Sequence, residues 1–183
     1  MLRIAGFEVR GYASAAEFLV GGNQTGGCLL LDVSLPGMSG VELQAVLATV
    51  DESLPIVFLT GRGDVATSVR AMKAGAVDFL TKPVKRDVLL SAVRTAIARD
   101  AVTRAHRAEL RGLRNRFETL TTRERQVFDR VIRGRLNKQI ADELGTSIRT
   151  VKAHRASVMT KMAAGSLAEL VGAGNRLEGA ARS

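Results

Sequence analysis

The stretch Cys28-Leu29-Leu30-Leu31-Asp32-Val33-Ser34-Leu35-Pro36-Gly37-Met38-Ser39-Gly40 decides the fold of the first part of the chain. Four apolar residues end at an aspartate, and a turn-forming segment then leads into an amphipathic helix that we predict over 41–50. The pattern recurs twice, as an apolar run over 56–59 before a helix over 65–72 and a run over 76–80 before a helix over 87–98. This alternation predicts βαβ units and a doubly wound α/β fold, with a parallel sheet covered on both faces.

The residues before this stretch predict two more elements of the same kind of domain. Apolar and polar residues alternate over 7–12, which is typical of a strand, and Ser14 stands where it would cap a helix over 14–20.

Polar residues follow three of the predicted strands. Asp32, Thr60 and Lys82 each stand just beyond an apolar run, and the carboxyl ends of parallel strands meet at one edge of a sheet. Taken singly, each suits a turn or a helix cap. Together, an acid, a hydroxyl and an ammonium suit phosphoryl transfer, with the carboxylate as nucleophile and the other two groups binding phosphoryl oxygens.

Composition excludes several classes of protein. The 183 residues are 46% hydrophobic and 25% charged, which is ordinary for a globular chain. The one cysteine, Cys28, lies in an apolar run and is predicted to be a buried structural thiol, so neither a disulfide nor a cysteine-rich metal site is expected. No stretch reaches the roughly 18 apolar residues of a membrane span, and the start lacks the apolar core of a signal peptide. We therefore expect a soluble cytoplasmic protein.

Charge is distributed unevenly along the chain. Residues 1–100 carry 10 basic and 10 acidic side chains, whereas residues 101–183 carry 17 and 8, so the whole net charge of +9 falls in the second part. A basic module suggests a polyanionic partner, either nucleic acid or an anionic membrane surface. The segment 99–118 is rich in arginine and poor in apolar residues, which indicates a solvated helical linker or an additional phosphate-contacting arm.

Helix signals after the linker predict a helix-turn-helix. Thr121 and Glu124 form a capping box ahead of an apolar stripe, and Gly134 ends that helix. A short helix capped by Asn137 and closed by Gly145 follows, and a helix capped by Ser147 then runs to about Met162. In such a motif the second helix enters the major groove of DNA.

The helical period assigns the two faces of that last helix. Val151, Val158 and Met162 form one stripe, and Arg149, Lys152, Ala153, Ala156 and Thr160 lie opposite. Lys152 is the first candidate for a contact to a base or a phosphate. Arg155 suits either an ion pair with Glu124 or a DNA contact, and His154 suits either packing or a phosphate hydrogen bond. The predicted DNA-binding residues are Lys152, Arg149, Thr150, Ala153, His154, Arg155, Lys138 and Asn137.

Residues 28–100 resemble the receiver domain of two-component response regulators. The resemblance implies that Asp32 is the phosphoacceptor, that Thr60 and Lys82 bind the phosphoryl group, and that the Lys82–Pro83 peptide is cis. It also implies that Phe79 is the aromatic side chain that changes rotamer with the threonine, although a plain core role is the alternative. Mg²⁺ is expected from the family, with Asp32 and the backbone carbonyl of Ser34 as ligands.

The first part of the chain also departs from that family. No adjacent acidic pair precedes Asp32, and the first strand of the receiver, with most of its first helix, has no counterpart, so either the true start lies upstream or the receiver is truncated. The Mg²⁺ site is therefore expected to be incomplete, and phosphorylation of Asp32 and docking of a histidine kinase are placed in doubt. A degenerate regulator or a dimerisation partner that acts without phosphorylation is the alternative, and a phosphoryl-accepting module is another.

The segment from Leu120 to Val171 resembles the LuxR-type DNA-binding domain, so the whole chain resembles the NarL/FixJ class of regulators. The resemblance implies an all-α four-helix domain whose last helix, near 166–175, supports a homodimer on inverted-repeat DNA. It further implies a sensor histidine kinase as partner, with RNA polymerase as an additional one, and a regulator rather than an enzyme. The expected organisation is a receiver over 1–98, a helical linker over 99–118 and a DNA-binding domain over 119–183.

Overall fold

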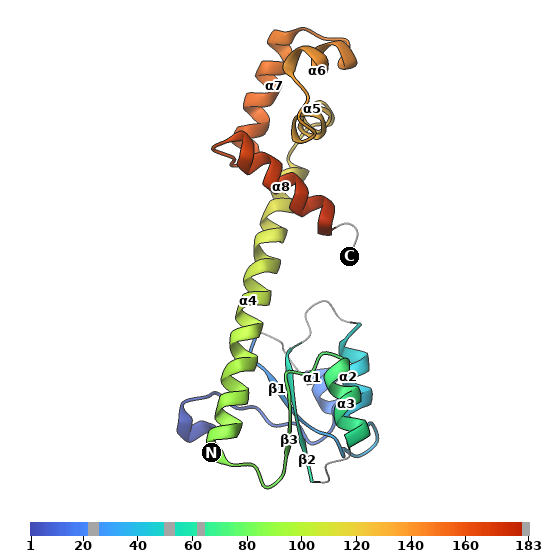
Figure 1. Ribbon diagram of the computed structural model, residues 1–183, viewed down its shortest axis with the longest axis vertical. Helices are drawn as coiled ribbons and strands as arrows, with labels where there is room; N and C mark the ends of the chain where they lie inside the picture. Colours follow the sequence, from blue (N-terminus) through green and yellow to red (C-terminus); the bar gives the residue numbers. More distant parts are fainter. Residues whose placement is uncertain (22–25, 50–53, 62–64, 181–183) are drawn as a thin grey trace. The chain divides into compact units, whose positions relative to one another are not determined.

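The computed structural model describes residues 1–21, 26–49, 54–61 and 65–180 (Figure 1). The chain divides into two compact units, Met1–Arg104 and Ala105–Ser183. A single long helix, α4 (Arg86–Glu118), contributes residues to both units. Each unit is described by itself below.

The first unit is built on three parallel strands. The strands β1 (Leu29–Asp32), β2 (Ile56–Thr60) and β3 (Asp78–Thr81) pair in that order, and the register places Leu31 beside Phe58. Between them run the helices α2 (Gly40–Leu47) and α3 (Val65–Lys73), and α1 (Ala15–Gly21) and a 3₁₀ turn, η1 (Arg3–Ala5), come before. The predicted parallel sheet of βαβ units is confirmed.

Helices cover both faces of this sheet, as the apolar strands require. Val57 in β2 packs with Leu89, Val93 and Ala96 of α4, whereas its neighbour Phe58 packs on the other face. That second face is covered by buried residues of α1, α2 and α3, namely Ala15, Phe18, Leu43, Leu47 and Ala71. Because side chains alternate along a strand, the apolar run of β2 supplies both cores at once.

The strand predicted over 7–12 does not form. These residues carry no strand or helix assignment, and within the described residues β1 has only β2 as a neighbouring strand. Alternation alone does not make a strand, because its backbone must also pair with a neighbouring strand, and within the described residues 7–12 pairs with none. The segment lies against the core instead, with Phe7 and Tyr12 packed on apolar residues.

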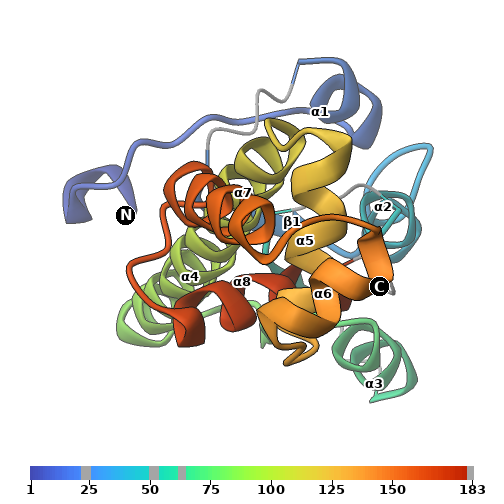
Figure 2. The same cartoon turned by 90° about the horizontal axis from the view of Figure 1, so that it is seen from above.

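Within its described residues, the second unit contains helices and no strand. After the end of α4 come α5 (Thr122–Ile132), α6 (Asn137–Leu144), α7 (Ile148–Lys161) and α8 (Leu167–Ala180). Helix α7 packs on α5 and α6, and α8 packs on α5; Figure 2 shows these helices from a second direction. Their core contains Val127, Phe128, Val131, Ile140, Val151, Val158, Met162 and Leu170, all buried.

Gly174 sets the approach of α8 to α5. A Cβ atom at this position would lie 2.8 Å from the side chain of Ile132, so the glycine allows close packing.

Among the described residues, no helix is both long and apolar enough to span a bilayer.

Candidate functional site

Asp32 lies at the carboxyl end of β1 with both carboxylate oxygens engaged. The Lys82 ammonium contacts Oδ2 at 2.5 Å, and the backbone N–H of Ser34 donates to Oδ1 at 3.0 Å. The hydrogen bond from Lys82 is the main reason why the pKa of Asp32 lies below its usual value, although partial desolvation acts in the opposite direction. The side chain keeps 31% of its surface exposed, so it remains accessible to a small reactant.

The loop after Asp32 is held tightly against the strand. Gly40 donates its backbone N–H to the carbonyl oxygen of Val33 at 3.1 Å. A Cβ atom at position 40 would lie 2.3 Å from the carbonyl oxygen of Asp32, a distance that no side chain tolerates. Ser39 and Glu42 then form a capping box that begins α2. Glycine is therefore required for α2 to start so close to the end of β1.

Lys82 and Thr60 meet at the same edge of the sheet. Thr60 is buried at the end of β2, and the backbone N–H of Lys82 donates to its carbonyl oxygen at 2.7 Å. The Lys82–Pro83 peptide is cis, as the resemblance implied. The structure thus brings the three residues predicted for phosphoryl chemistry to one edge, and it joins Asp32 to Lys82 directly.

Phe79 is half-buried in β3, and its ring centroid lies 5.9 Å from that of Phe58. It packs with the core on the α1–α2–α3 face of the sheet. Its role in switching stays a prediction.

Cys28 is also half-buried, and burial raises the pKa of its thiol.

The donor set around Asp32 does not fit Mg²⁺. This ion requires nearly ideal octahedral coordination by oxygen. The described residues contain no cluster of three His, Cys, Asp or Glu side chains that could hold a metal, and each Asp32 oxygen already accepts one hydrogen bond, from Lys82 or from Ser34. A role for the Ser34 carbonyl as a ligand stays a prediction.

Helix α7 presents a basic face to solvent. Val151, Val158 and Met162 are buried, as the helical period predicted, and Arg149, Lys152, Ala153, Ala156 and Thr160 on the opposite side are exposed. In the described part of the chain, no hydrogen bond or ion pair engages the side chains of Arg149 and Lys152. The same holds for Lys138, which is exposed in the first turn of α6.

Ser147 caps α7 as predicted, by accepting the N–H of Thr150 at 3.0 Å. The Thr150 hydroxyl also lies 2.8 Å from that of Ser147, so this side chain takes part in the cap. His154 is half-buried beside the core stripe.

Two predicted side-chain roles in this motif are wrong. Leu136, not Asn137, is the N-cap of α6, because the Gln139 side chain accepts the Leu136 N–H at 2.9 Å. Asn137 Oδ1 instead accepts a hydrogen bond from Arg155 at 3.2 Å, which ties α7 to α6. Arg155 is therefore turned toward α6 rather than toward Glu124.

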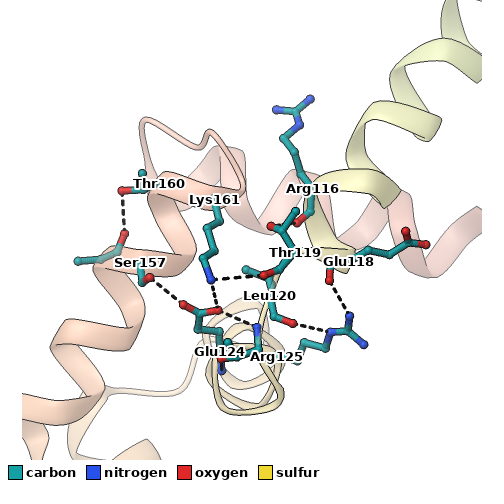
Figure 3. A network of polar contacts seen from close by, with 11 residues as sticks. Arg116, Glu118, Thr119, Leu120, Glu124, Arg125, Ser157, Thr160 and Lys161 are labelled. Carbon is teal, nitrogen blue, oxygen red and sulfur yellow. Dashed lines mark hydrogen bonds and ion pairs between the residues drawn. The ribbon is translucent and has the colours of Figure 1, made fainter.

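Glu124 is bound by side chains that sequence reasoning missed (Figure 3). Its Oε2 accepts hydrogen bonds from Lys161 Nζ and from the Thr121 N–H, both at 2.7 Å. Its Oε1 accepts a hydrogen bond from the Ser157 hydroxyl at 2.7 Å. These contacts, led by that of Lys161, lower the pKa of Glu124 to about 2. The spacing of Ser157 and Lys161, four residues apart on one face of α7, was the available signal.

Comparisons with known proteins identify both units. Residues 1–94 match the family model described as the response regulator receiver domain, and residues 118–173 match that of bacterial regulatory proteins of the luxR family. The response regulator protein TodT of Pseudomonas putida strain F1 is 42% identical over 179 residues, which cover 97% of this chain and 79% of TodT.

Two further likenesses extend over both units. The transcriptional regulatory protein FixJ of Rhizobium meliloti is 43% identical, with 93% of this chain and 84% of FixJ covered. A low-resolution structure of the response regulator StyR is 45% identical and superimposes with a TM-score of 0.85, covering 96% of this chain and 89% of that one. With its three-stranded parallel sheet and its four-helix basic unit, this chain belongs to the response regulators that join a flavodoxin-like receiver domain to a LuxR-type DNA-binding domain.

Proposed function

We propose that this protein regulates transcription by binding double-stranded DNA through the exposed face of α7. The observation that carries the proposal is the pair of cations on that face, Arg149 and Lys152, which have no protein partner in the described part of the chain. Several other cations of the same unit are engaged, such as Lys161 with Glu124 and Arg130 with Glu143. Ala153, which lies beside these unpaired cations, has a small side chain that lets the helix approach base edges closely.

The remaining residues of the motif divide into contacting and positioning groups. Lys138 is exposed at the start of α6 and suits a phosphate contact. Thr150 and His154 lie beside the exposed face and suit contacts at its border. Arg155 and Asn137 bind each other, and we assign them to fixing the angle between α6 and α7 rather than to the DNA itself.

The test of this face uses a DNA duplex selected from a random-sequence library by repeated binding to the full-length protein. Lys152→Ala should weaken binding by about 5- to 150-fold, because a good base contact is worth about 1–3 kcal/mol. The matched control is Lys73→Ala, which removes an exposed lysine from α3 in the other unit. Equal DNA binding by Lys152→Ala and Lys73→Ala would show that this face of α7 is not the DNA interface.

We further propose that DNA binding by this chain does not require phosphorylation of Asp32. A receiver domain implies a histidine kinase partner, and receivers of this family generally bind Mg²⁺. The proposal is supported by the surroundings of Asp32, because the described residues contain no cluster of three His, Cys, Asp or Glu side chains that could hold the metal.

The corresponding experiment incubates the protein with acetyl phosphate and Mg²⁺ and measures its intact mass. We expect little or no phosphoryl adduct, and DNA affinity unchanged by the treatment. Asp32→Asn is the matched variant, because it keeps the shape of the side chain and removes the nucleophilic carboxylate. A full adduct on the wild-type protein that is absent from Asp32→Asn, together with tighter DNA binding, would establish control by phosphorylation instead.

As a bacterial DNA-binding regulator, the protein is proposed to act in the cytoplasm as a homodimer on inverted-repeat sites. Exposed Leu167 at the start of α8 supports a contact between copies there. Sedimentation of the protein with DNA of one and of two half-sites should show one and two bound copies respectively.

A further inference from the structure

We propose that the exposed face of α7 selects DNA half-sites in which guanine and thymine lie within two base pairs of each other. Cationic side chains would bind the guanines, and methyl groups of the protein would contact the thymine methyls. The proposal rests on the proposed function, because it concerns the same face of the same helix, and it adds which bases this face recognises. The side chains that α7 exposes are Ile148, Arg149, Lys152, Ala153, Ala156 and Thr160.

The residue types of α7 limit the bases that it can recognise. In the major groove, adenine is typically bound by Asn or Gln, and cytosine by Glu or Asp. None of these four residue types occurs between Ile148 and Lys161. Guanine is bound by Arg or Lys, and the thymine methyl is contacted by Ala or by the methyl group of Thr. The exposed face of α7 therefore carries dedicated groups for guanine and thymine and for neither of the other two bases.

The hydroxyl groups of α7 do not change this conclusion, because each is bonded within the protein. Their partners are Ser147 for Thr150, Glu124 for Ser157 and the carbonyl oxygen of Ala156 for Thr160. The last bond, at 3.1 Å, turns the Thr160 hydroxyl to the backbone of its own helix. Its methyl group is then the part of Thr160 that remains for a contact with DNA.

The three methyl-bearing side chains lie on one side of α7. Ala153, Ala156 and Thr160 follow one another at intervals of three and four residues, which places them along one face of a helix. All three are exposed, and we call them the methyl row. Contacts between the methyl row and thymine methyls would remove apolar groups of both partners from water, which favours binding.

The cations stand beside the methyl row. Arg149 is four residues before Ala153, and Lys152 is four residues before Ala156. Side chains four residues apart on a helix have Cβ atoms about 5–6 Å from each other. Successive base pairs are about 3.4 Å apart along the DNA axis. A guanine bound by either cation should therefore have a methyl-contacted thymine within one or two base pairs.

The opposite side of α7 holds this face in place. Val151 and Val158 are fully buried, and Ser157 and Lys161 both bind Glu124 of α5. The helix backbone therefore needs little ordering when it binds, and small side chains on an ordered backbone allow close contacts at low entropic cost.

The test starts from the duplex that the full-length protein enriches from a random-sequence library. Each thymine of the half-site is replaced in turn by deoxyuridine, which removes the methyl group and keeps the base pair. We expect the Kd to rise about threefold to fivefold at two or three positions, the effect of one buried methyl group. A guanine within two base pairs of each should also be required, as shown by weaker binding when 7-deazaguanine removes its N7 acceptor.

Protein variants assign each thymine to its partner. Ala153→Gly and Ala156→Gly each remove one methyl group of the row, so in each variant the effect of deoxyuridine should vanish at one position and persist at the others. Ala108→Gly is the matched control, because it places glycine at an exposed position of α4 in the same unit and should keep every deoxyuridine effect. Hydrogen exchange at the Val158 amide would show that the unit remains folded in all three variants.

The outcomes separate this proposal from the proposed function. DNA binding that depends on Lys152 but on no thymine methyl would overturn the present proposal and leave the proposed function standing. Deoxyuridine effects that stay the same in both glycine variants of α7 would also overturn it, because the methyl groups would then act through the shape of the DNA or through another part of the protein. If Lys152→Ala binds DNA as the wild type does, the proposed function fails, and this proposal fails with it.

Discussion

Neutralising Glu124 should destabilise the second unit in a way that depends on pH. This carboxyl group is 5% exposed and is bound by Lys161, Ser157 and the Thr121 amide (Figure 3). Its pKa falls from 4.5 to about 2 on folding. At about 1.4 kcal/mol per pKa unit, the charged form contributes on the order of 3 kcal/mol to stability at neutral pH.

The sign follows from the lowered pKa. Above pH 4.5 the carboxylate is charged in both the folded and the unfolded chain, so its contribution is fully present. As the pH falls from 4.5 to about 2, the unfolded chain takes up a proton first, and the contribution is lost. The wild-type protein should therefore lose stability across this range, and Glu124→Gln should lose much less.

Glutamine is the informative substitution because it also fits the third position of a capping box. Native-state hydrogen exchange at the Val127 and Val158 amides would report on the second unit alone. At pH 7 we expect Glu124→Gln to lower the free energy of opening by about 2–3 kcal/mol, and the difference from wild type to shrink toward pH 2.

A matched control is Glu143→Gln, which breaks the ion pair with Arg130 on the surface of the same unit. Glu143 is 40% exposed, so this change should cost about 1 kcal/mol or less. Equal losses in the two variants at pH 7, or the same acid sensitivity in wild type and Glu124→Gln, would refute the reasoning.

Three further predictions follow from individual contacts. Gly40→Ala should lower the thermal midpoint of the first unit in calorimetry, because the new Cβ would lie 2.3 Å from the Asp32 carbonyl oxygen; an unchanged midpoint would mean that α2 shifts freely. Lys82→Met should raise the pKa of Asp32 toward its ordinary value, measured by carbon NMR of the carboxyl group, and a constant pKa would show that the Ser34 N–H suffices. Ser147→Ala should cost about 1 kcal/mol in urea unfolding of the second unit through the lost cap of α7, whereas Ser147→Asp should restore most of it.

Features with local causes could be predicted from the sequence. The apolar run before Asp32, the capping box of Thr121 and Glu124, and the buried stripe of α7 all follow from short-range patterns, and the structure has each of them. The meeting of Asp32 and Lys82 at one edge also follows, because parallel strands align their carboxyl ends.

Features that depend on distant partners were not predictable in this way. The alternation over 7–12 is the same whether or not a neighbouring strand exists, so the sequence pattern could not show that the segment stays irregular. The partner of Glu124 is Lys161 rather than Arg155, since the direction of a long side chain depends on how α7 packs on α5 and α6. Leu136 rather than Asn137 is the N-cap of α6 because the Gln139 side chain accepts the backbone N–H of Leu136.

Helix α4 has a practical consequence for anyone who cuts the chain into fragments. Asp100, only 4% exposed, accepts the N–H of Gly27 just before β1 and pairs with Arg104, so a receiver fragment must extend at least that far to keep its first strand anchored. In the other unit, Leu113 is buried in the helical core and Arg116 donates to the Met162 carbonyl, so a DNA-binding fragment must begin before them. Between these anchors lie residues 105–112, and because Glu109 pairs with Arg176 of α8, a cleavage site is best placed within 105–108.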